Sequence, residues 1–253
     1  MRDLTVGVFR PDDERLADAV ELVESLGATP IPDPMLAVEP TGKTPREDAE
    51  YAIITSKTGA ELVAGQRGDQ DGRWNPGSAT LCAIGPKTAD ALRDLGYSVA
   101  VVPDEYTSSG LVETLADRVD GSKVEVARSD HGSPVLLEGL EAAGAYVHET
   151  ILYQLVRPPE SGDSVALAAD GDLDAACFTS SLTVEHWLET ARERGVLEAA
   201  REGLTAATVG VIGEPTAETA RDHGLPVDLV ASEATFDTLA CETVELAAPT
   251  YHE

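Results

Sequence analysis

The chain has 253 residues and a formal net charge of −28 at neutral pH, with 46 acidic against 18 basic side chains. This length is sufficient for one large domain or two of ordinary size, and the negative charge argues against nucleic-acid binding, which needs a basic face. Because the sequence holds no apolar run long enough to span a bilayer and no signal-peptide pattern, we expect a cytoplasmic protein without a membrane partner.

Apolar runs and helical patterns alternate along the chain. The first run, residues 4–9, is typical of a strand buried on both faces of a parallel sheet, and Leu16 and Val23 lie on the buried stripe of the helix expected next. Residues 30–40 contain four prolines, which excludes a helix or a central strand and indicates an extended linker or edge strand. Residues 65–78 are polar, hold four glycines and predict a mobile surface loop.

The remaining elements are predicted from the same patterns. Strands are expected at residues 51–56, 80–84, 99–102, 123–127, 175–179, 207–212 and 227–230. Helices are expected at residues 59–64, 108–119, 135–143, 195–203 and 236–246, and directly after residues 85, 180 and 213. Residues 147–156 alternate between apolar and polar and could pair with residues 30–40 as a two-stranded link. The alternation of strands and helices predicts an α/β fold with parallel sheets.

One short pattern occurs twice, as AIGPKTA at residues 83–89 and as VIGEPTA at residues 211–217. Each copy follows an apolar run and opens a helix with proline in its first turn, and Gly96 or Gly224 then ends that helix. The N–H groups at such a helix start favour an anionic ligand. Glu214 in the second copy either weakens anion binding there or points its side chain outward.

Further pairs of residues recur in the same order in the two halves of the chain. Thr55-Ser56 matches Thr179-Ser180, and Arg10 matches Arg128. Such ordered matches predict two similar lobes, although unrelated α/β units can share turns rich in Gly and Thr.

The acidic residues are spread over the predicted helices, and lysine is scarce. This pattern is typical of a halophilic protein, in which surface charge maintains solubility. The three cysteines, Cys82, Cys177 and Cys241, lie in or beside apolar sequence, which predicts buried free thiols in a reducing cytoplasm. No spacing of Cys and His indicates a metal site.

Taken together, the motifs resemble the uroporphyrinogen-III synthase family over the whole chain. The residues that carry the resemblance are Arg10-Pro11, Thr55-Ser56, Thr179-Ser180, residues 85–89 and 213–217, and Tyr153. The chain departs from the family pattern at Lys57-Thr58 and Leu182-Thr183, where many relatives carry other small or polar residues.

The resemblance implies two flavodoxin-like (Rossmann-like) parallel-sheet lobes joined by a two-stranded antiparallel linker. Residues 1–33 and 159–253 would form the first lobe, and residues 40–152 would form an inserted second lobe. Residues 34–39 and 153–158 would be the linker strands.

The function implied by the resemblance is that of a lyase of tetrapyrrole biosynthesis, on the route to heme, siroheme and cobalamin. The enzyme would cyclise hydroxymethylbilane with inversion of ring D and release water, which gives uroporphyrinogen III. The substrate would lie in a cleft between the lobes. No cofactor and no metal are implied, and a monomer is expected.

Tyr153 is the candidate catalytic residue, because hydroxide is a poor leaving group and a phenol protonated at neutral pH can donate a proton. The alternative is that Tyr153 only packs on the linker. The candidate groups for the substrate carboxylates are Arg10, Thr55, Ser56, Lys57, Gly85, Lys87, Thr88, Arg128, Ser129, Thr179, Ser180, Ser181, Gly213 and Thr216. For the hydroxyl residues the alternative is a helix N-cap, and for the basic residues it is a solvated surface charge.

Two other classes of function stay open at this point. One is a two-lobed small-ligand binding protein without catalysis, and the other is a two-lobe glycosyltransferase. The sequence lacks both a Gly-x-Gly-x-x-Gly loop and a Walker loop, which argues against a nucleotide site.

Overall fold

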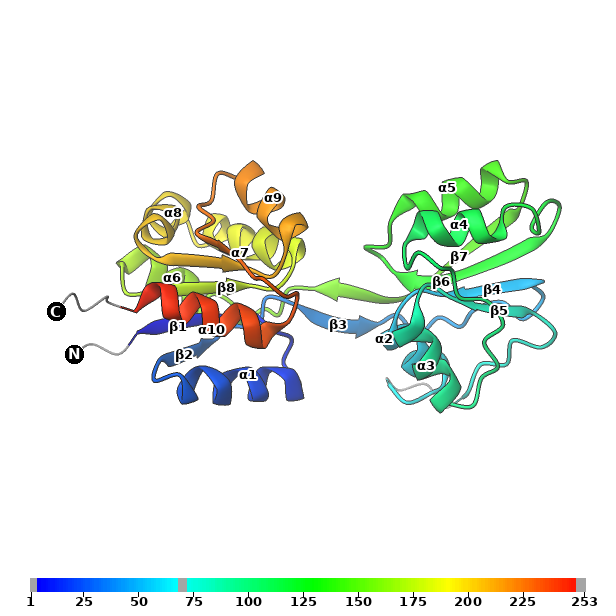
Figure 1. Cartoon of the computed structure of the whole chain (residues 1–253), viewed down its shortest axis with the longest axis horizontal. Helices are drawn as coiled ribbons and strands as arrows, with labels where there is room; N and C mark the ends of the chain where they lie inside the picture. The colour runs from blue at the N-terminus through cyan, green and yellow to red at the C-terminus, as the bar shows by residue number, and fades with distance from the viewer. Residues whose placement is uncertain (1–3, 68–71, 249–253) are drawn as a thin grey trace. The chain divides into compact units, whose positions relative to one another are not determined.

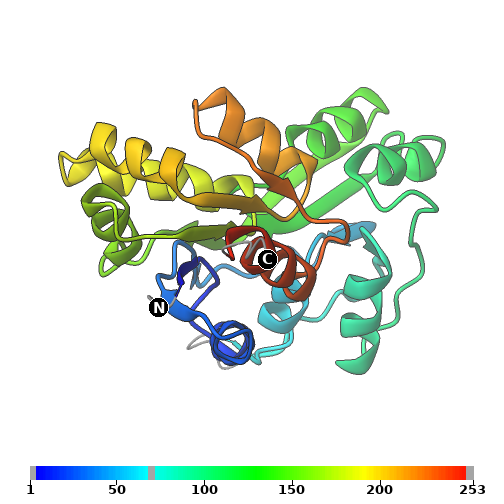
Figure 2. The same ribbon diagram turned by 60° about the vertical axis from the view of Figure 1, so that its left-hand side comes forward.

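The structure is a computed structural model that describes residues 4–67 and 72–248. The chain divides into two compact units (Figure 1). Unit 1 comprises residues 1–37 and 156–253, and unit 2 comprises residues 38–155. Each unit contains a five-stranded sheet with helices on both faces (Figures 1 and 2). The fold is therefore α/β, as the strand–helix alternation predicts.

Unit 1 has the strand order β10-β9-β8-β1-β2, and all its neighbouring strands run parallel. The strands are β1 (Thr5–Val8), β2 (Thr29–Pro32), β8 (Ala175–Phe178), β9 (Thr208–Val211) and β10 (Leu229–Val230). The helices are α1 (Glu14–Ser25), α6 (Asp163–Asp170), α7 (Ser181–Glu193), α8 (Leu197–Ala206), α9 (Glu214–Asp222) and α10 (Phe236–Ala247). Successive residues of each strand point to opposite faces of the sheet, so the strands contribute to a hydrophobic core on each face. Val6 and Val8 pack with α1 and α10, whereas Ala176 and Phe178 pack with α6 to α9.

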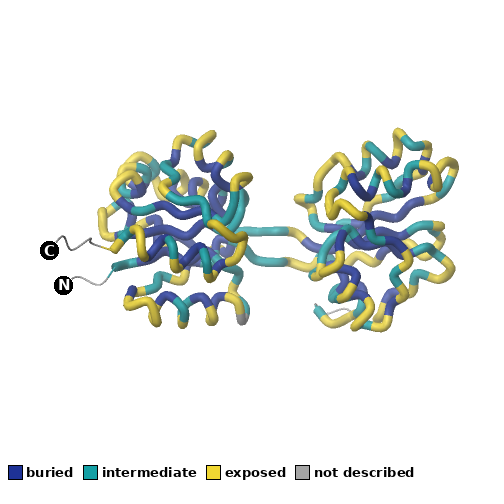
Figure 3. Tube along the Cα trace, in the orientation of Figure 1, coloured by how far each residue is buried: buried dark blue, intermediate teal, exposed yellow. Residues whose placement is uncertain are grey.

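Unit 2 has the strand order β3-β7-β6-β4-β5. The strands are β3 (Ala37–Pro40), β4 (Tyr51–Ile54), β5 (Thr80–Ala83), β6 (Lys123–Ser129) and β7 (Tyr146–Val156). The helices are α2 (Lys57–Val63), α3 (Pro86–Asp94), α4 (Ser108–Leu115) and α5 (Pro134–Ala142). One core lies under α2 and α3 and the other under α4 and α5, so β4, β5 and β6 are drawn mainly as buried in Figure 3.

Short-range signals explain where most helices begin. Ser56, Thr107, Ser180 and Thr235 have extended backbones and accept a hydrogen bond from an N–H in the first turn of α2, α4, α7 and α10, respectively. Helix α6 has no such local cap and was not expected. Asp33, 129 residues before Gly162, accepts hydrogen bonds from the backbone N–H groups of Gly162 and Ser164 instead. A cap contributed from so far away leaves no signal in the sequence around the helix.

Two expectations differ from the structure in unit 2. Residues 99–102 form no strand, and only Val101 bridges to Cys82 of β5. Proline follows at position 103, so the extended pairing cannot continue past this bridge. The predicted mobile loop is also wrong for Trp74, which is 3% exposed. Its carbonyl lies 2.8 Å from the hydroxyl of Tyr97, whose ring stacks under Arg73. Residues 68–71 of that loop lie outside the described residues.

None of the helices in the described part of the chain has the length and apolar character that crossing a bilayer requires.

The reactivity of the cysteines tests whether the strands of the two sheets are buried as the structure has them. Cys82 and Cys177 are buried, as predicted, and burial raises the pKa of each thiol to about 12. The prediction of a buried thiol is wrong for Cys241, which is exposed. Since the thiolate is the reactive form, we expect an aromatic disulfide reagent at pH 8 to react quickly with Cys241 alone in the native protein. All three cysteines should react after denaturation. The variant Cys241→Ser should lose the fast reaction, and any remaining fast thiol would contradict the burial of the other two.

Candidate functional site

Four of the predicted site segments lie at the carboxyl edge of the sheet in unit 2. Strands β4, β5, β6 and β7 run parallel, with Ile54 opposite both Ala83 and Ala127, and Ser129 opposite Tyr153. Thr55-Ser56, the Gly85 turn and the end of β6 therefore meet at one edge, beside Tyr153. Ligand sites of open α/β sheets form at this edge.

Tyr153 and Ser56, both predicted from sequence, are in direct contact. The Tyr153 hydroxyl donates to Ser56 Oγ at 3.0 Å, and the tyrosine is 6% exposed. Ser56 is also the N-cap of α2, where its Oγ accepts the Gly59 N–H at 2.9 Å. Two donors thus occupy the lone pairs of Ser56 Oγ and leave its own proton available. Tyr153 packs in the core beneath α2 and α3 as well, so packing and a polar role coexist.

A loop that was not among the predicted site residues fixes the backbone of β7 around Tyr153. The N–H of Asp130 donates to the Tyr153 carbonyl at 3.3 Å, and its carboxylate accepts the Leu155 N–H at 3.0 Å and contacts His131 Nδ1 at 2.8 Å. Burial works to raise the pKa of Asp130, but the His131 and Leu155 hydrogen bonds outweigh it and lower the pKa. The adjacent Asp and His in the sequence were the only available signal for this arrangement.

The first Gly turn supplies a helix start without a side-chain cap. Gly85 is the N-cap of α3 and has no side chain to cap it, so among the described residues the early N–H groups of α3 have no side-chain cap. Thr88 is buried, whereas Lys87 is exposed. The backbone of Gly85 is extended, at φ −169°, but a Cβ there would lie 3.2 Å from the Cβ of Tyr106. The glycine therefore serves close packing against Tyr106.

The matching segments of unit 1 lie at the carboxyl edge of its own sheet. Arg10 follows β1, Thr179-Ser180 follow β8, and Gly213 follows β9, all of which are parallel neighbours. Ser180 caps α7 in a capping box with Thr183. Thr179 Oγ1 donates to the Phe9 carbonyl at 3.3 Å, which ties the ends of β1 and β8 together.

The second Gly turn resembles the first. Gly213 is the N-cap of α9, again without a side-chain cap, and Thr216 is buried. Ser181 Oγ donates to the Pro215 carbonyl at 3.1 Å and holds this turn against α7. The carboxylate of Glu214 pairs with Arg221 at 2.6 Å, in exposed surroundings. Glu214 is thus committed to a partner on its own helix, and its negative charge is partly compensated.

The basic candidates have unequal surroundings. The guanidinium of Arg10 lies 5.0 Å from the centroid of the Phe236 ring, and its pKa is lowered by burial and by nearby Arg15. Lys57 is exposed and 3.7 Å from Glu61. Arg128 is 6% exposed, and its guanidinium bonds to the Glu149 carboxylate and to the Ser133 carbonyl, both at 2.5 Å. Arg128 is thus held by two partners within unit 2, and its contact with the substrate stays a prediction.

The other two candidates of unit 2 also lie at its carboxyl edge. Thr55 and Ser129 are half-buried there, directly after β4 and at the end of β6. In the described part of the chain, no group of three or more His, Cys, Asp or Glu residues could hold a metal ion.

Comparison with known proteins agrees with the sequence motifs. The profile of the family described as uroporphyrinogen-III synthase HemD matches residues 17–241. A putative uroporphyrinogen-III synthase of Methanothermobacter thermautotrophicus is 32% identical, over 87% of this chain and 90% of its own length. The uroporphyrinogen-III synthase of Synechococcus elongatus is 27% identical over 76% of this chain and 73% of its own.

A solved structure shares the fold. A variant of uroporphyrinogen III synthase from the bacterium Thermus thermophilus aligns with a TM-score of 0.67 and 20% identity, over 96% of this chain and 98% of its own. At that identity the likeness speaks for the fold alone. The family profile and the sequence relatives, which span most of the chain, carry the assignment: the chain belongs to the uroporphyrinogen-III synthase family.

Proposed function

We propose that the chain is a uroporphyrinogen-III synthase, a lyase that cyclises hydroxymethylbilane with inversion of ring D. The observation that supports this most strongly, beside family membership, is the pair of hydroxyls of Tyr153 and Ser56 at the carboxyl edge of unit 2. The alternative, a ligand-binding protein without catalysis, has no support in the family of the chain.

We propose further that each unit is one flavodoxin-like lobe. The order β2-β1-β8-β9-β10 in unit 1 corresponds to the 2-1-3-4-5 order of flavodoxin-like sheets, and β5-β4-β6-β7 in unit 2 to its first four strands. On this proposal residues 34–39 and 153–158 link the lobes as antiparallel strands, and β3 and β7, which are neighbours and drawn with opposed arrows in Figure 1, support that reading.

Tyr153 is proposed to supply the proton that the leaving hydroxyl needs. The C–O bond of the terminal hydroxymethyl group breaks, and the hydroxyl leaves as water with the phenolic proton. When the Ser56 hydroxyl rotates to donate to the Tyr153 oxygen, the phenolic proton is released toward substrate and the developing phenolate is stabilised. Ring closure later releases a proton from a pyrrole carbon. This proton returns to the phenolate oxygen of Tyr153, so charge and protons balance.

The substrate carboxylates need donors, and each unit offers a similar set. The uncapped helix starts of α3 and α9 present N–H groups, beside the hydroxyls of Thr55 and Thr179 and the cation of Arg10. These contacts would fix the conformation of a flexible chain, and positioning of this kind supplies a large part of the rate.

The proposal is tested by supplying hydroxymethylbilane to the purified chain in high salt and identifying the isomer that forms. The expected product is the type III isomer, at a rate that rises with protein concentration. Formation of the type I isomer alone, at the rate without protein, would exclude the activity. Saturable binding of the bilane without turnover would favour the non-catalytic alternative.

The state of the protein in the cell is also a proposal. We propose a monomer in a salty cytoplasm, because the charge of −28 is spread over the surface helices and disfavours self-association. Light scattering in molar KCl should give the mass of one chain.

Ser56→Ala should lower kcat about tenfold, because it removes the partner that stabilises the Tyr153 phenolate, a loss of roughly 1.4 kcal/mol in transition-state stabilisation. Loss of the α2 cap should also destabilise the protein by about 1 kcal/mol. Thr107→Ala is the matched control, since it removes the cap of α4 and the Gly110 N–H bond at similar cost. If both variants lower kcat equally, loss of stability explains the effect and Ser56 does not stabilise the Tyr153 phenolate.

A further inference from the structure

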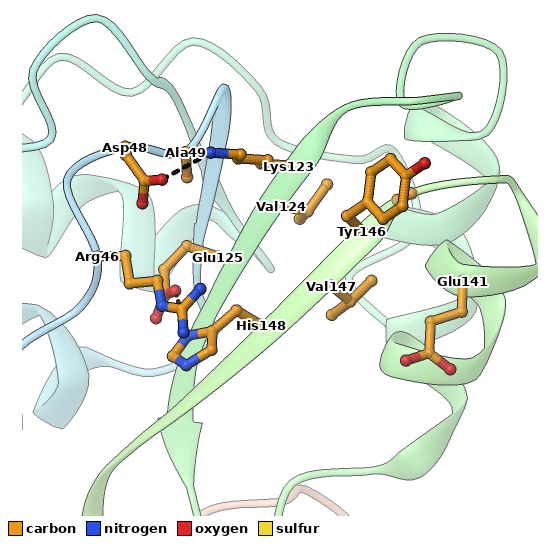
Figure 4. Close-up of a pocket in the computed structure, with 11 residues that line it drawn as sticks. Arg46, Asp48, Ala49, Lys123, Val124, Glu125, Glu141, Tyr146, Val147 and His148 are labelled. Atoms are coloured by element: carbon orange, nitrogen blue, oxygen red, sulfur yellow. Dashed lines mark hydrogen bonds and ion pairs between the residues drawn. The ribbon is translucent and has the colours of Figure 1, made fainter.

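The side chains of β7 change face once along the strand. Figure 4, a close-up of the cavity that the first residues of β6 and β7 line, shows the regular part. There Val147 packs against the core under α4 and α5, whereas His148 points to the other face, where its Nδ1 contacts Glu125. Because side chains alternate along a strand, an uninterrupted β7 would place Tyr153 on the face of Val147. Tyr153 instead packs in the core beneath α2 and α3.

A β-bulge accounts for the change of face. The register of β6 and β7 shifts between Arg128 and Ser129, where β7 has one extra residue, Leu152. An extra residue in one strand re-aims the side chains that follow it. Leu152 and Tyr153 are consecutive, yet both pack in the core beneath α2 and α3. The bulge therefore places the Tyr153 hydroxyl on the face where Ser56 accepts its hydrogen bond.

Hydrogen bonds within unit 2 hold the bulge from both sides. On the side of β3, the Thr41 N–H donates to the Leu152 carbonyl at 2.9 Å. On the side of β6, the Asp130 N–H donates to the Tyr153 carbonyl at 3.3 Å, and Asp130 Oδ1 accepts the Leu155 N–H at 3.0 Å. Asp130 thus binds the backbone of β7 at Tyr153 and again two residues later, with its main chain and its side chain.

The carboxylate of Asp130 is itself fixed in place. Its side chain is 26% exposed, and Oδ1 also contacts His131 Nδ1 at 2.8 Å. Burial works to raise the pKa of Asp130, but the hydrogen bonds from His131 and Leu155 lower it, which favours the ionised form. A charged acceptor makes a stronger hydrogen bond to a backbone N–H than a neutral one does. The bond to the Leu155 N–H therefore opposes a return of β7 to regular pairing.

Without this bond, β7 can relax toward the regular register, in which a slip of one residue moves side chains to the opposite face. Tyr153 would then turn away from Ser56, and a misplacement of about 1 Å at a reacting group can cost a hundredfold in rate. We propose that Asp130 is a positioning residue, which holds the bulge of β7 so that Tyr153 faces Ser56 and the substrate. The inference rests on the proposed role of Tyr153 as proton donor, and Asp130 itself transfers no proton.

The first test is a double-mutant cycle in the full chain, with hydroxymethylbilane as substrate and single-turnover formation of the type III isomer as the readout. Asp130→Ala should lower the rate about tenfold, with KM unchanged, because Tyr153 is displaced only in part. In a Tyr153→Phe background the same change should lower the rate less than about twofold, since the proton donor is already absent. Equal factors in the two backgrounds would overturn the assignment, because a general loss of stability acts on both.

Two further variants separate positioning from stability. Asp130→Asn keeps Oδ1, the oxygen at which both Leu155 and His131 meet Asp130, and should retain most of the wild-type rate. Asp228→Ala is the matched control in unit 1, where the Asp228 N–H donates to the Val209 carbonyl at 2.9 Å and its carboxylate accepts the Val209 N–H at 2.8 Å. It should lower the urea midpoint as Asp130→Ala does but leave the rate unchanged. An Asp130→Asn rate as low as that of Asp130→Ala, or an equal loss in Asp228→Ala, would contradict the positioning role.

A second readout does not depend on turnover. A nuclear Overhauser effect between the ring protons of Tyr153 and the β-protons of Ser56 should be present in the wild type and in Asp130→Asn. It should be lost in Asp130→Ala, while the amide spectrum remains that of a folded protein. Persistence of the effect in Asp130→Ala would overturn the inference. Since this measurement needs no substrate, it decides whether Asp130 orients Tyr153 even if no type III isomer forms, so the inference and the proposed synthase activity fail separately.

Discussion

Tyr153→Phe should lower kcat for formation of the type III isomer by roughly a hundredfold, the lower end of the range for a general acid. Phenylalanine keeps the packing of the ring beneath α2 and α3 but removes the proton donor to the leaving hydroxyl. The effect stays at the lower end because positioning of the flexible substrate, which the variant retains, supplies much of the rate. Single-turnover measurement of the isomer formed is the direct check.

A second tyrosine variant shows whether loss of any tyrosine hydroxyl lowers kcat or only loss of the Tyr153 hydroxyl. Tyr51→Phe removes a hydroxyl that donates to the Arg118 carbonyl at 3.2 Å, at the start of β4 and away from the carboxyl edge. It should leave kcat unchanged. An unaltered kcat in Tyr153→Phe would remove Tyr153 from the chemistry and leave it a packing role only. A raised KM with unchanged kcat would assign it to substrate binding.

Gly203→Ala should destabilise unit 1 by about 3 kcal/mol, the upper part of the usual range for overpacking. A Cβ at this position would lie 1.8 Å from the carbonyl oxygen of Ala168, which is backbone of α6 and cannot turn away. The direction of the change in the free energy of unfolding is informative, because the same substitution in an open helix interior stabilises by about 1 kcal/mol through helix propensity. Urea unfolding in molar KCl, with the midpoint and the slope both reported, measures the change.

The neighbouring residue provides the matched control. Glu202→Ala lies on the exposed side of α8 and should change the free energy of unfolding by no more than about 0.5 kcal/mol. An equal or greater stability for Gly203→Ala would mean that α6 and α8 are not packed as closely as the structure has them.

Much of the fold was predictable because its determinants are local. Apolar runs such as residues 4–9 and 51–56 are spaced for buried strands, and β1 and β4 lie within them. Ser56 and Ser180 were recognised after their strands, and each caps the helix that follows. The two Gly turns likewise begin α3 and α9. In each case the residues that decide the structure lie within one turn or one strand of each other.

The candidate site was predictable only in part. The family motifs pointed to Tyr153 and Ser56, which lie 97 residues apart, but their 3.0 Å contact depends on the order of β7, β6 and β4 in the sheet. Arg10 and Arg128 match in sequence, yet only Arg128 is buried against a carboxylate, because Glu149 happens to lie on the neighbouring strand. The hydrogen bond between the Asp130 carboxylate and the backbone of β7 could not be predicted from sequence. The only signals were the charge of Asp130 and the neighbouring His131.

The sequence by itself thus determined most strands, most helix starts and the family, since these depend on periodicity, caps and short motifs. The tertiary structure alone decided which distant residues meet. Asp33 caps a helix 129 residues away, and the buried carboxylate of Glu125 on β6 meets His148 on the neighbouring strand β7. Partners of this kind follow from strand order and register, which arise when separate apolar surfaces are buried together and which no local stretch of sequence encodes.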